Sequence, residues 1–382
     1  MTVSTLNILF VHQSAELYGS DRTFVQSIRA CRMKYPHALI TVLLPFEGPL
    51  IDYIQPVANQ VIIDDDLIIL RKSTFVRTII LKPVNFIRQI LKSIKLIKCH
   101  DLTYINTTVI LCFIIATRFS KKTSIIHIHE LPTGLLKIIL NLILCFSNGK
   151  ILFNSRATCL AYPVVKYRNH AIIPNGTNIE HYKPIKETAT LNVLLIGRFN
   201  AWKGHTLLLN ALSLLTKEKQ ALIQIRFLGS TFKGQQFFKD SIQETTVRLG
   251  LSSMVSFYDF VDDPSSFYYW ANLIVVPSIL PEPFGLVAIE SMGHGRPVIG
   301  SNHGGLADII EHNSAGYLFA PGNAKELAER LLCYINDPEK LLMHGKQARS
   351  VFLKRFHENS YLESIGQVFQ NNYVVNKTEN IL

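Results

Sequence analysis

The chain has 382 residues, which exceeds the size at which one hydrophobic core usually keeps growing, so two domains are expected. Hydrophobic residues make up 48% of it and charged residues 18%, a composition that excludes a disordered chain. The net charge of +11 lies in the first half: residues 1–184 carry 21 Lys and Arg against 10 Asp and Glu, and the remainder carries 18 of each. This asymmetry predicts an anionic partner for the first half.

The six cysteines form no CxxC pair, which predicts reduced thiols and neither a disulfide nor a zinc site. The first residues contain no charged region followed by an apolar one, so we expect no secretion and a cytoplasmic protein. No apolar run reaches the roughly 18 to 20 uncharged residues that cross a bilayer. The nearest candidates, Leu102 to Thr117 and Leu135 to Phe146, are each interpreted as a buried strand or helix.

Along the first half, short apolar runs alternate with segments of helical spacing. Leu6 to His12 is followed by a polar loop and then by helical spacing from Asp21 to Cys31. Further buried strands are predicted at Leu39 to Leu44, Val61 to Ile63, Leu102 to Ile105, Ser124 to His129 and Ile151 to Asn154. Repeated strand and helix units with nearly continuous apolar strands predict a parallel, doubly wound sheet.

The segment from Ile172 through Pro184 and the polar stretch to Thr190 are typical of a linker, so we place an N-terminal domain at 1–184 and a C-terminal domain at 185–355. Strands of the second domain are predicted at Val193 to Ile196, Ile223 to Leu228, Val255 to Phe257, Leu273 to Val276 and Val298 to Ile299. Residues 356–382 are expected to form a helix and tail that pack back toward the N-terminal domain. The fold class is therefore α/β, with two Rossmann-like domains whose parallel sheets face each other across a cleft.

The sharpest functional pattern lies between Val275 and Asp308. A strand runs into a proline-rich loop and a helix start at Phe284-Gly285-Leu286, where free amides and the helix dipole suit a diphosphate. Glu282 and Glu290 are spaced so that they can bond the hydroxyls of a sugar and of a ribose. On spacing alone, an acidic cap and a solvated helical Glu remain the simpler interpretation.

A second loop of the same domain contains Gly197, Arg198 and Lys203, again between a strand and a helix. Both cations can bind phosphate oxygens. The alternative interpretation is that they are two exposed basic residues of a loop. In the first domain, Gly19 and Ser20 form a small-residue turn into a helix, and His129 ends a strand. His129 is a candidate catalytic residue or a structural histidine; with His127 it lacks a third ligand, so no metal site is predicted.

Together these motifs resemble glycosyltransferase family 4, the retaining nucleotide-sugar transferases of GT-B architecture. The residues that carry the resemblance are Tyr18-Gly-Ser20, His129-Glu130, Pro174-Asn-Gly176, Gly197-Arg198, Lys203-Gly204, Glu282 to Glu290 with Phe284-Gly-Leu286, Gly304-Gly305 and Gly316-Tyr-Leu318. The resemblance implies transfer of a hexose-type sugar from a nucleotide diphosphate-sugar to a glycan or polyprenyl-diphosphate-linked acceptor. It places that reaction in bacterial surface polysaccharide biosynthesis, with no cofactor and no metal.

The resemblance also implies roles for the donor site. Arg198 and Lys203, in the turn that Gly197 opens, would bind the diphosphate with help from the amides of Phe284, Gly285 and Leu286. Glu290 would hold the ribose, and Glu282 would contact the donor sugar near its anomeric centre.

In the first domain, Gly19 and Ser20 would approach the phosphates, and His129 would line the reaction centre on the acceptor side. Ser20 stands where many family members have a second glycine. Asp308 stands where a Glu is common, and its role stays open.

A basic segment extends from Arg71 to Lys98 without an acidic residue. Its cations are Arg71, Lys72, Arg77, Lys82, Arg88, Lys92, Lys95 and Lys98. After Pro83 the apolar residues recur every three or four positions, which predicts a basic amphipathic helix that binds the anionic inner face of the plasma membrane. The alternative is a surface helix that packs on its own sheet. No base-reading motif accompanies the charge, so no nucleic acid partner is expected.

Other functions compatible with the same architecture are a nucleotide-sugar epimerase, a phosphorylase or a noncatalytic membrane-bound scaffold. The sequence lacks the Gly-x-Gly-x-x-Gly turn of dinucleotide-dependent oxidoreductases and the phosphate-binding loop of nucleotidases.

Overall fold

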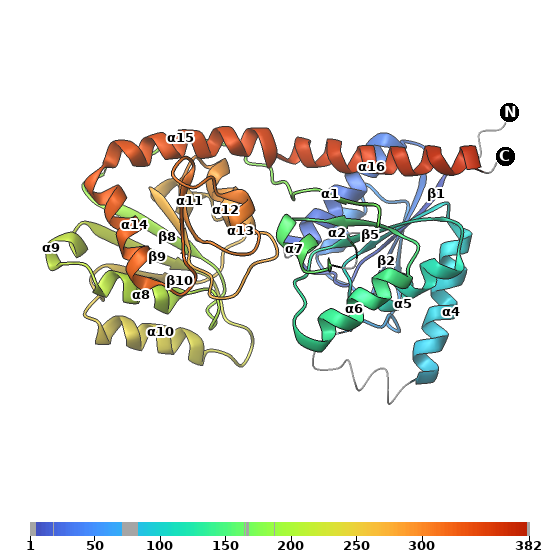
Figure 1. The fold of residues 1–382 in the computed structure, drawn as a ribbon, viewed down its shortest axis with the longest axis horizontal. Helices are drawn as coiled ribbons and strands as arrows, with labels where there is room; N and C mark the ends of the chain where they lie inside the picture. The colour runs from blue at the N-terminus through green and yellow to red at the C-terminus, as the bar shows by residue number, and fades with distance from the viewer. Residues whose placement is uncertain are drawn as a thin grey trace. The chain divides into compact units, whose positions relative to one another are not determined.

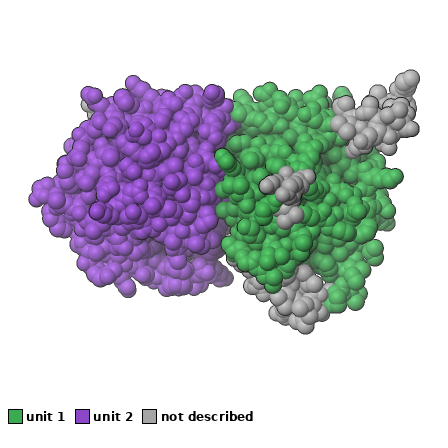
Figure 2. Space-filling model, viewed as in Figure 1, with its two compact units in different colours: residues 1–176, 358–382 green, residues 177–357 purple. Residues whose placement is uncertain are grey.

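The structure, a computed structural model, describes residues 5–17, 19–70, 83–163, 165, 168–186 and 188–379, with side chains up to residue 372. It divides into two compact units, which Figure 2 colours separately: unit 1 contains Met1–Gly176 and Glu358–Leu382, and unit 2 contains Thr177–His357.

The first division falls after Gly176 rather than after Pro184, because the intervening residues are bonded within unit 2. The amide of Thr177 donates to the carbonyl of Phe356 at 3.0 Å, and the Arg296 guanidinium donates to the carbonyl of Lys183.

Unit 1 is built on a seven-stranded sheet with the strand order β3-β2-β1-β4-β5-β6-β7. All of its strand pairs are parallel. The strands are β1 Asn7–Val11, β2 Leu39–Leu44, β3 Gln60–Ile63, β4 Leu102–Asn106, β5 Thr123–Ile128, β6 Lys150–Phe153 and β7 His170–Ile172. The helices are α1 Gly19–Lys34, α2 Leu50–Ile54, α4 Pro83–Cys99, α5 Leu111–Ala116, the 3-10 helix η1 Thr117–Phe119, α6 Gly134–Phe146, α7 Arg156–Leu160 and α16 Glu358–Glu379.

Both faces of this sheet are covered by helices, as Figure 1 shows. Along β1, Ile8 and Phe10 belong to a core shared with α1, α2 and α16. Leu9 and Val11 belong to the opposite core, shared with α4, α5 and α6. Because successive side chains of a strand point to opposite faces, a strand buried on both sides must be apolar throughout. This explains the uninterrupted apolar run at the start of the chain.

Unit 2 has a six-stranded sheet in the order β10-β9-β8-β11-β12-β13, again parallel throughout. Its strands are β8 Leu191–Ile196, β9 Ile223–Leu228, β10 Val255–Tyr258, β11 Leu273–Val276, β12 Val298–Ser301 and β13 Gly316–Phe319. Its helices are α8 His205–Ser213, α9 Lys217–Gln220, α10 Phe237–Arg248, α11 Ser265–Trp270, α12 Leu286–Gly293, α13 Leu306–Ile309, α14 Ala324–Asn336 and α15 Pro338–Arg355. The predicted α/β class with two parallel, Rossmann-like sheets is confirmed.

The chain returns to unit 1 through α16, which packs along α1. The hydroxyl of Tyr361 and Ser27 Oγ lie 2.7 Å apart, and Tyr361, Ile365 and Phe369 are buried in the core that contains β1. Residues of the C-terminal helix α16 therefore complete the hydrophobic core that packs on the N-terminal strand β1.

Each sheet has one point at which the strand order reverses. In unit 1 this switch point lies between β1 and β4, and in unit 2 it lies between β8 and β11. Ligands of open parallel sheets bind beyond the carboxyl ends of the strands at such points. A ligand is therefore expected at the loops that begin at His12, Thr107, Gly197 and Pro277.

Candidate active site

In unit 2, the loop between β8 and α8 is fixed by its own side chains. Asn200 Oδ1 accepts from the amides of Trp202 and Lys203 at 3.1 and 3.0 Å. Gly204 has φ +76° and backs onto the end of β11, where a Cβ would lie 1.9 Å from the carbonyl oxygen of Pro277. Only glycine permits this approach, so the Lys203-Gly204 pair sets the position of the lysine beside the second loop.

Lys203 and Glu282 form an ion pair across the unit 2 switch point. Lys203 Nζ lies 2.7 Å from Glu282 Oε1, and the two side chains are 25% and 14% exposed. Ser278 Oγ donates to the same Oε1. Burial raises the pKa of Glu282, but the charge and hydrogen bond of Lys203, with the Ser278 hydrogen bond, outweigh it and leave this pKa below its ordinary value. Glu282 is therefore an anion held at a fixed place.

The glycine pair Gly304-Gly305 holds the backbone of this glutamate. The amide of Gly305 donates to the carbonyl of Glu282 at 2.8 Å. Gly304 has φ +59°, and a Cβ there would lie 2.4 Å from the same carbonyl oxygen. His303 Nε2 lies 2.9 Å from the carbonyl oxygen of Ser278 and ties the same turn to the β11 loop. The turn after β12 therefore positions Glu282.

Helix α12 starts directly behind Glu282. Gly285 is its N-cap residue, and the helix runs from Leu286 to Gly293, so its first amides point out of the helix without intrahelical acceptors. Phe284 is buried beneath this start. Glu290, one turn further on, accepts from the hydroxyl of Tyr268 at 2.9 Å.

Arg198 follows Gly197 at the end of β8. Its guanidinium carbon lies 4.0 Å from the ring centroid of Phe232, a cation–π contact that holds the side chain beside the loop. The side chain of Lys203 covers Gly197, where a Cβ would meet its methylene carbons at 3.3 Å. Lys203 thus spans from Gly197, next to Arg198, to Glu282.

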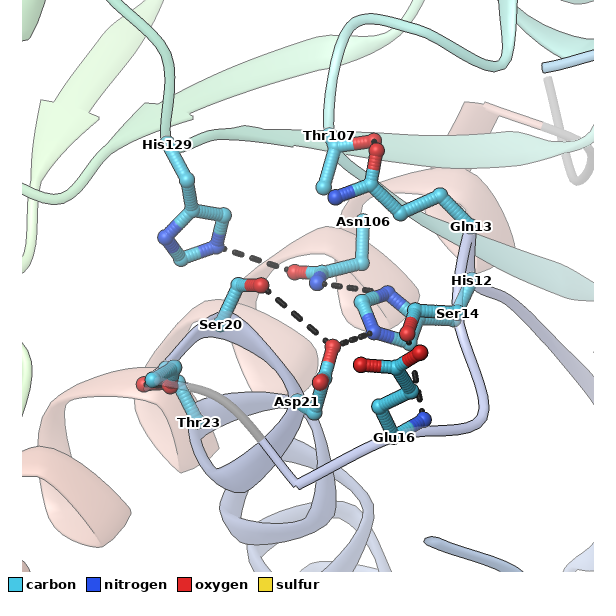
Figure 3. Close-up of polar contacts among 11 residues, drawn as sticks. His12, Gln13, Ser14, Glu16, Ser20, Asp21, Thr23, Asn106, Thr107 and His129 are labelled. Atoms are coloured by element: carbon cyan, nitrogen blue, oxygen red, sulfur yellow. Dashed lines mark hydrogen bonds and ion pairs between the residues drawn. The ribbon is translucent and has the colours of Figure 1, made fainter. Parts of the chain in front are cut away.

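In unit 1, the switch point carries a buried chain of polar side chains (Figure 3). Asp21 Oδ1 and His12 Nε2 lie 2.7 Å apart, and Asn106 Nδ2 lies 2.9 Å from His12 Nδ1. Asn106 Oδ1 in turn lies 2.9 Å from His129 Nε2, and His129 Nδ1 lies 3.3 Å from Asn154 Nδ2. We call these five residues the polar chain; none is more than 8% exposed.

The amide groups of the polar chain fix the protons on its imidazoles. An asparagine nitrogen only donates and its oxygen only accepts, so His12 and His129 each carry the proton on Nε2 and accept at Nδ1. Burial lowers the pKa of His129 well below its ordinary value, and the neighbouring His127 and His12 act in the same direction. His129 is therefore neutral, and both of its nitrogens already have partners.

Gly19 and Ser20 form the first turn of α1 beside this chain. Ser20 Oγ donates to Asp21 Oδ1 at 3.4 Å, and the carbonyl of Gly19 accepts from Thr23 Oγ1 at 3.1 Å. Glu130, which follows His129, accepts from the amide and hydroxyl of Thr108 at 3.2 and 3.1 Å.

The structure thus groups the sequence-predicted residues by unit. Gly197, Arg198, Lys203, Glu282, Phe284, Gly285, Leu286 and Glu290 gather at the unit 2 switch point, and Gly19, Ser20 and His129 gather at that of unit 1. Sequence reasoning missed the polar partners His12, Asp21, Asn106, Asn154, Ser278 and His303. Their signal was position, since His12 and Asn154 directly follow a strand and Asn106 ends one, but their pairing depends on the strand order.

Asp308 lies on α13, where its carbonyl accepts from Arg355 Nη2 at 3.0 Å. The neighbouring Glu311 carboxylate lies 3.8 Å from Arg355 Nη1. The contact through Asp308 is thus made by its backbone.

The predicted basic helix is present as α4, whereas Arg71, Lys72, Arg77 and Lys82 lie outside the described residues. Gln89, Ser93 and Ile97 are buried against unit 1, whereas Val84, Ile87 and Leu91 are 74%, 57% and 62% exposed. The helix therefore packs on its own domain along one side and exposes apolar residues on another.

Within the described residues, no group of three or more His, Cys, Asp or Glu could hold a metal ion. No helix in that part of the chain combines the length and the apolar character needed to span a bilayer. A cavity of about 300 Å³ in unit 2, lined by Thr190, Leu222 and Asn272 among others, lies at the amino ends of the strands, away from the switch point.

Residues 178–351, which make up most of unit 2, match the family model described as glycosyl transferases group 1. A stretch of 138 residues is 33% identical to an uncharacterized glycosyltransferase of Methanocaldococcus jannaschii, covering 36% of this chain and 33% of that protein. A stretch of 205 residues is 28% identical to the lipopolysaccharide 1,2-N-acetylglucosaminetransferase of Salmonella typhimurium, covering 50% and 53%. The chain thus matches about half of the length of these relatives or less.

Among solved structures, HepE of Anabaena in complex with UDP matches with a TM-score of 0.79 and 22% identity, over 96% of this chain and 100% of that one. The same protein with UDP-glucose gives a TM-score of 0.76, again with 22% identity and the same coverage. At this identity the likeness establishes the fold, which is that of GT-B glycosyltransferases.

Proposed function

We propose that this protein is a retaining glycosyltransferase of family 4, which moves a hexose-type sugar from a nucleotide diphosphate-sugar to a hydroxyl of a glycan or lipid-linked acceptor. The group 1 glycosyltransferase match of residues 178–351 supports the reaction type. The HepE structures with UDP and UDP-glucose support the donor class. The Salmonella relative, named as a lipopolysaccharide transferase, supports a saccharide acceptor in bacterial surface polysaccharide biosynthesis.

The observation that carries the proposal is the unused bonding capacity of the Lys203–Glu282 pair. An ammonium group has three N–H donors, and Glu282 accepts one of them. Both described hydrogen bonds to the Glu282 carboxylate end on Oε1. Lys203 can therefore donate to a diphosphate while Glu282 Oε2 accepts from a sugar hydroxyl. One fixed ion pair would thus contact the two groups, diphosphate and sugar, that the reaction separates.

The proposed reaction breaks the bond between the anomeric carbon and the diphosphate oxygen, and forms a bond from that carbon to the acceptor hydroxyl on the same face. The hydroxyl proton passes to the departing diphosphate. Arg198, Lys203 and the first amides of α12 stabilise the charge that develops on this leaving group. Because these cations fill the role of a divalent ion, we propose that the reaction needs no metal.

Glu290 is assigned to the donor ribose and His129 to the acceptor side of the reaction. His129 is held there in a fixed orientation as a neutral imidazole, since the polar chain engages both of its nitrogens. Gly19 and Ser20 are assigned to the donor phosphates through the first turn of α1. We place the reaction at the cytoplasmic, anionic face of the plasma membrane, where lipid-linked acceptors are exposed.

Transfer from radiolabelled UDP-glucose to a bacterial lipid extract, in the presence of EDTA, tests the proposal. Glu282→Ala should lower the rate about 100-fold or more, whereas Glu329→Ala, an exposed glutamate on α14, should leave it unchanged. Equal rates for wild type and Glu282→Ala would refute the site. The anomeric configuration of the product, read by NMR, should match that of the donor; an inverted product would refute retention, and activity only with added Mn²⁺ would refute metal independence.

A further inference from the structure

Helix α6 exposes one complete apolar side. Leu140, Asn141 and Leu144 are buried against unit 1. Residues spaced by three and four positions point outward instead: Leu135 is 71% exposed, Ile138 58%, Leu142 63% and Phe146 46%. Of the buried strand or helix predicted at Leu135 to Phe146, the helix is confirmed, but its full burial is wrong, because it is apolar on both sides and only one side packs on a core.

The exposed side of α6 continues onto η1. Phe119 is 51% exposed, and its ring centroid lies 6.0 Å from that of Phe146. Arg118 stacks over the same Phe146 ring at 5.7 Å and donates to Asn148 Oδ1 at 3.1 Å. We call Phe119, Leu135, Ile138, Leu142 and Phe146 the α6 surface. Contiguous apolar patches of this kind mark sites of interaction.

The part of the chain that carries the α6 surface is strongly basic. Residues 83–150, which contain α4, η1 and α6, carry nine basic residues and two acidic ones. Both acidic side chains are engaged: Asp101 pairs with Lys122 at 2.8 Å, and Glu130 accepts from Thr108. The basic residues are Arg88, Lys92, Lys95, Lys98, Arg118, Lys121, Lys122, Lys137 and Lys150. Of these, Lys92 forms an ion pair with Asp64 at 2.7 Å, from the loop that precedes α4.

Helices α4 and α6 lie in one layer on the same side of the sheet (Figure 1). Both contribute to the core that contains Ile97, Leu140 and Leu144, with α5 and η1 in the same layer. Apolar residues that face outward, flanked by cations and by no unpaired acid within residues 83–150, form the pattern of an interfacial membrane helix. The charge complements an anionic lipid surface, and each nearby cation strengthens the attraction.

We propose that the α6 surface inserts into the interface of an anionic phospholipid bilayer, with the cations of α4 and of the segment after η1 at the headgroups. The element that inserts is therefore α6, whereas α4, which the charge pattern of the sequence singles out, supplies charge. This proposal names the membrane surface on which the proposed function relies, yet its test requires no sugar transfer.

Cys145 provides a probe on α6 itself. It is exposed, as is Cys99 at the end of α4, whereas Cys31 and Cys112 are buried. An environment-sensitive fluorophore on Cys145, in a Cys99→Ser background, should shift to the blue and brighten severalfold on vesicles of equal phosphatidylglycerol and phosphatidylcholine. The same label on Cys99, in a Cys145→Ser background, should change much less. A larger response at Cys99, or none at either position, would overturn the assignment to α6.

Flotation of the full chain with the same vesicles gives the matched comparison. Leu142→Glu should lower the partition coefficient about tenfold or more, because it places a charge in the inserted side. Leu353→Glu, at a 50% exposed leucine of α15 in unit 2, should not change it. Equal binding of both variants, or wild-type binding that ignores phosphatidylglycerol, would overturn the proposal. So would self-association abolished by Leu142→Glu without vesicle binding, since that identifies a second copy as the partner.

Loss of transfer in Leu142→Glu with soluble acceptor sugar would indicate damage to the enzyme, whereas loss with lipid acceptor alone follows from the membrane role. Membrane binding without any transferase activity would refute the proposed function and leave this inference standing.

Discussion

The two switch points share a strand order and use their polar groups in opposite ways. In unit 1 the polar chain is buried, and His12, Asn106 and His129 bond to one another from end to end. In unit 2 Lys203 and Glu282 are partly exposed, and their ion pair uses one N–H of the ammonium and one carboxylate oxygen, Oε1.

The difference separates two tasks that one topology can perform. A buried polar network that satisfies itself stiffens the loops that carry it, because breaking any link leaves a buried group without a partner. A pair of charges that glycine-containing loops hold in place, and that can form further hydrogen bonds, is preorganised to bind a ligand. We therefore assign positioning to the unit 1 chain and recognition of the diphosphate to unit 2.

The largest effect is expected for Lys203→Ala. The variant removes the cation that faces the developing charge and also releases Glu282, so kcat/KM for transfer should fall about 100- to 1000-fold with little change in stability. Steady-state kinetics with UDP-glucose measure this. Lys219→Ala removes an ammonium that donates to the exposed Asn336, and this control should retain wild-type kinetics. An equal fall of kcat/KM in both variants would show that Lys203 has no specific role in transfer.

Asn106→Ala should act on stability instead. It leaves His12 Nδ1 and His129 Nε2 buried without their partner, which costs about 2 to 3 kcal/mol of unfolding free energy in unit 1. Hydrogen exchange of the β1, β4 and β5 amides reports this unit separately, since a two-domain chain need not unfold in one step. Asn148→Ala, at an exposed position, should change nothing. Unaltered exchange in Asn106→Ala would show that the chain contributes no rigidity.

Acid should weaken unit 1 through its buried imidazoles. Burial lowers the pKa of His127 to about 3, so the folded state stays neutral while the unfolded chain takes up a proton below about pH 6.5. This contribution to the free energy of unfolding is complete above pH 6.5 and is lost as the pH falls toward 3. The loss reaches about 2 kcal/mol at pH 5. His127→Gln should flatten the decline between pH 7 and 5 in thermal unfolding. His181→Gln, at an exposed histidine, should leave the slope as it is; an identical slope for both would contradict the prediction.

Gly304→Ala should give the smallest effect on transfer, a loss of about tenfold. Its Cβ would press on the carbonyl of Glu282 at 2.4 Å and move that side chain away from Lys203. Gly322 shares the positive φ, at +78°, but a Cβ there would have no neighbouring atom within 4 Å, so Gly322→Ala should cost only about 1 kcal/mol of stability. Equal losses of activity in both would mean that backbone strain, rather than the position of Glu282, is responsible.

Strands were the most predictable part of the fold. β2, β9 and β11 have the predicted bounds, because a strand buried on both faces is a short apolar run that ends at a polar loop. β13 and β7 were missed, since a glycine opens Gly316-Tyr-Leu-Phe319 and a histidine opens His170-Ala-Ile172, so neither forms a continuous run of apolar residues. The layout of helices followed from the same alternation.

The candidate site was predictable only where the sequence itself brings residues together. Glu282 and the start of α12 are neighbours along the chain, and so are Arg198 and Lys203. The ion pair between the two loops depends on β8 lying beside β11, and the polar chain depends on β1 lying beside β4, which no local pattern encodes. Likewise, which side of α6 faces solvent is decided by the sheet that it covers.

The assignment of diphosphate recognition to unit 2 is tested most directly by titrating UDP into the wild type, Lys203→Ala and Asn106→Ala by calorimetry in the presence of EDTA. We predict saturable binding to the wild type, affinity reduced about tenfold or more in Lys203→Ala, and affinity within about twofold of wild type in Asn106→Ala. Equal affinity in wild type and Lys203→Ala, or a loss confined to Asn106→Ala, would contradict it.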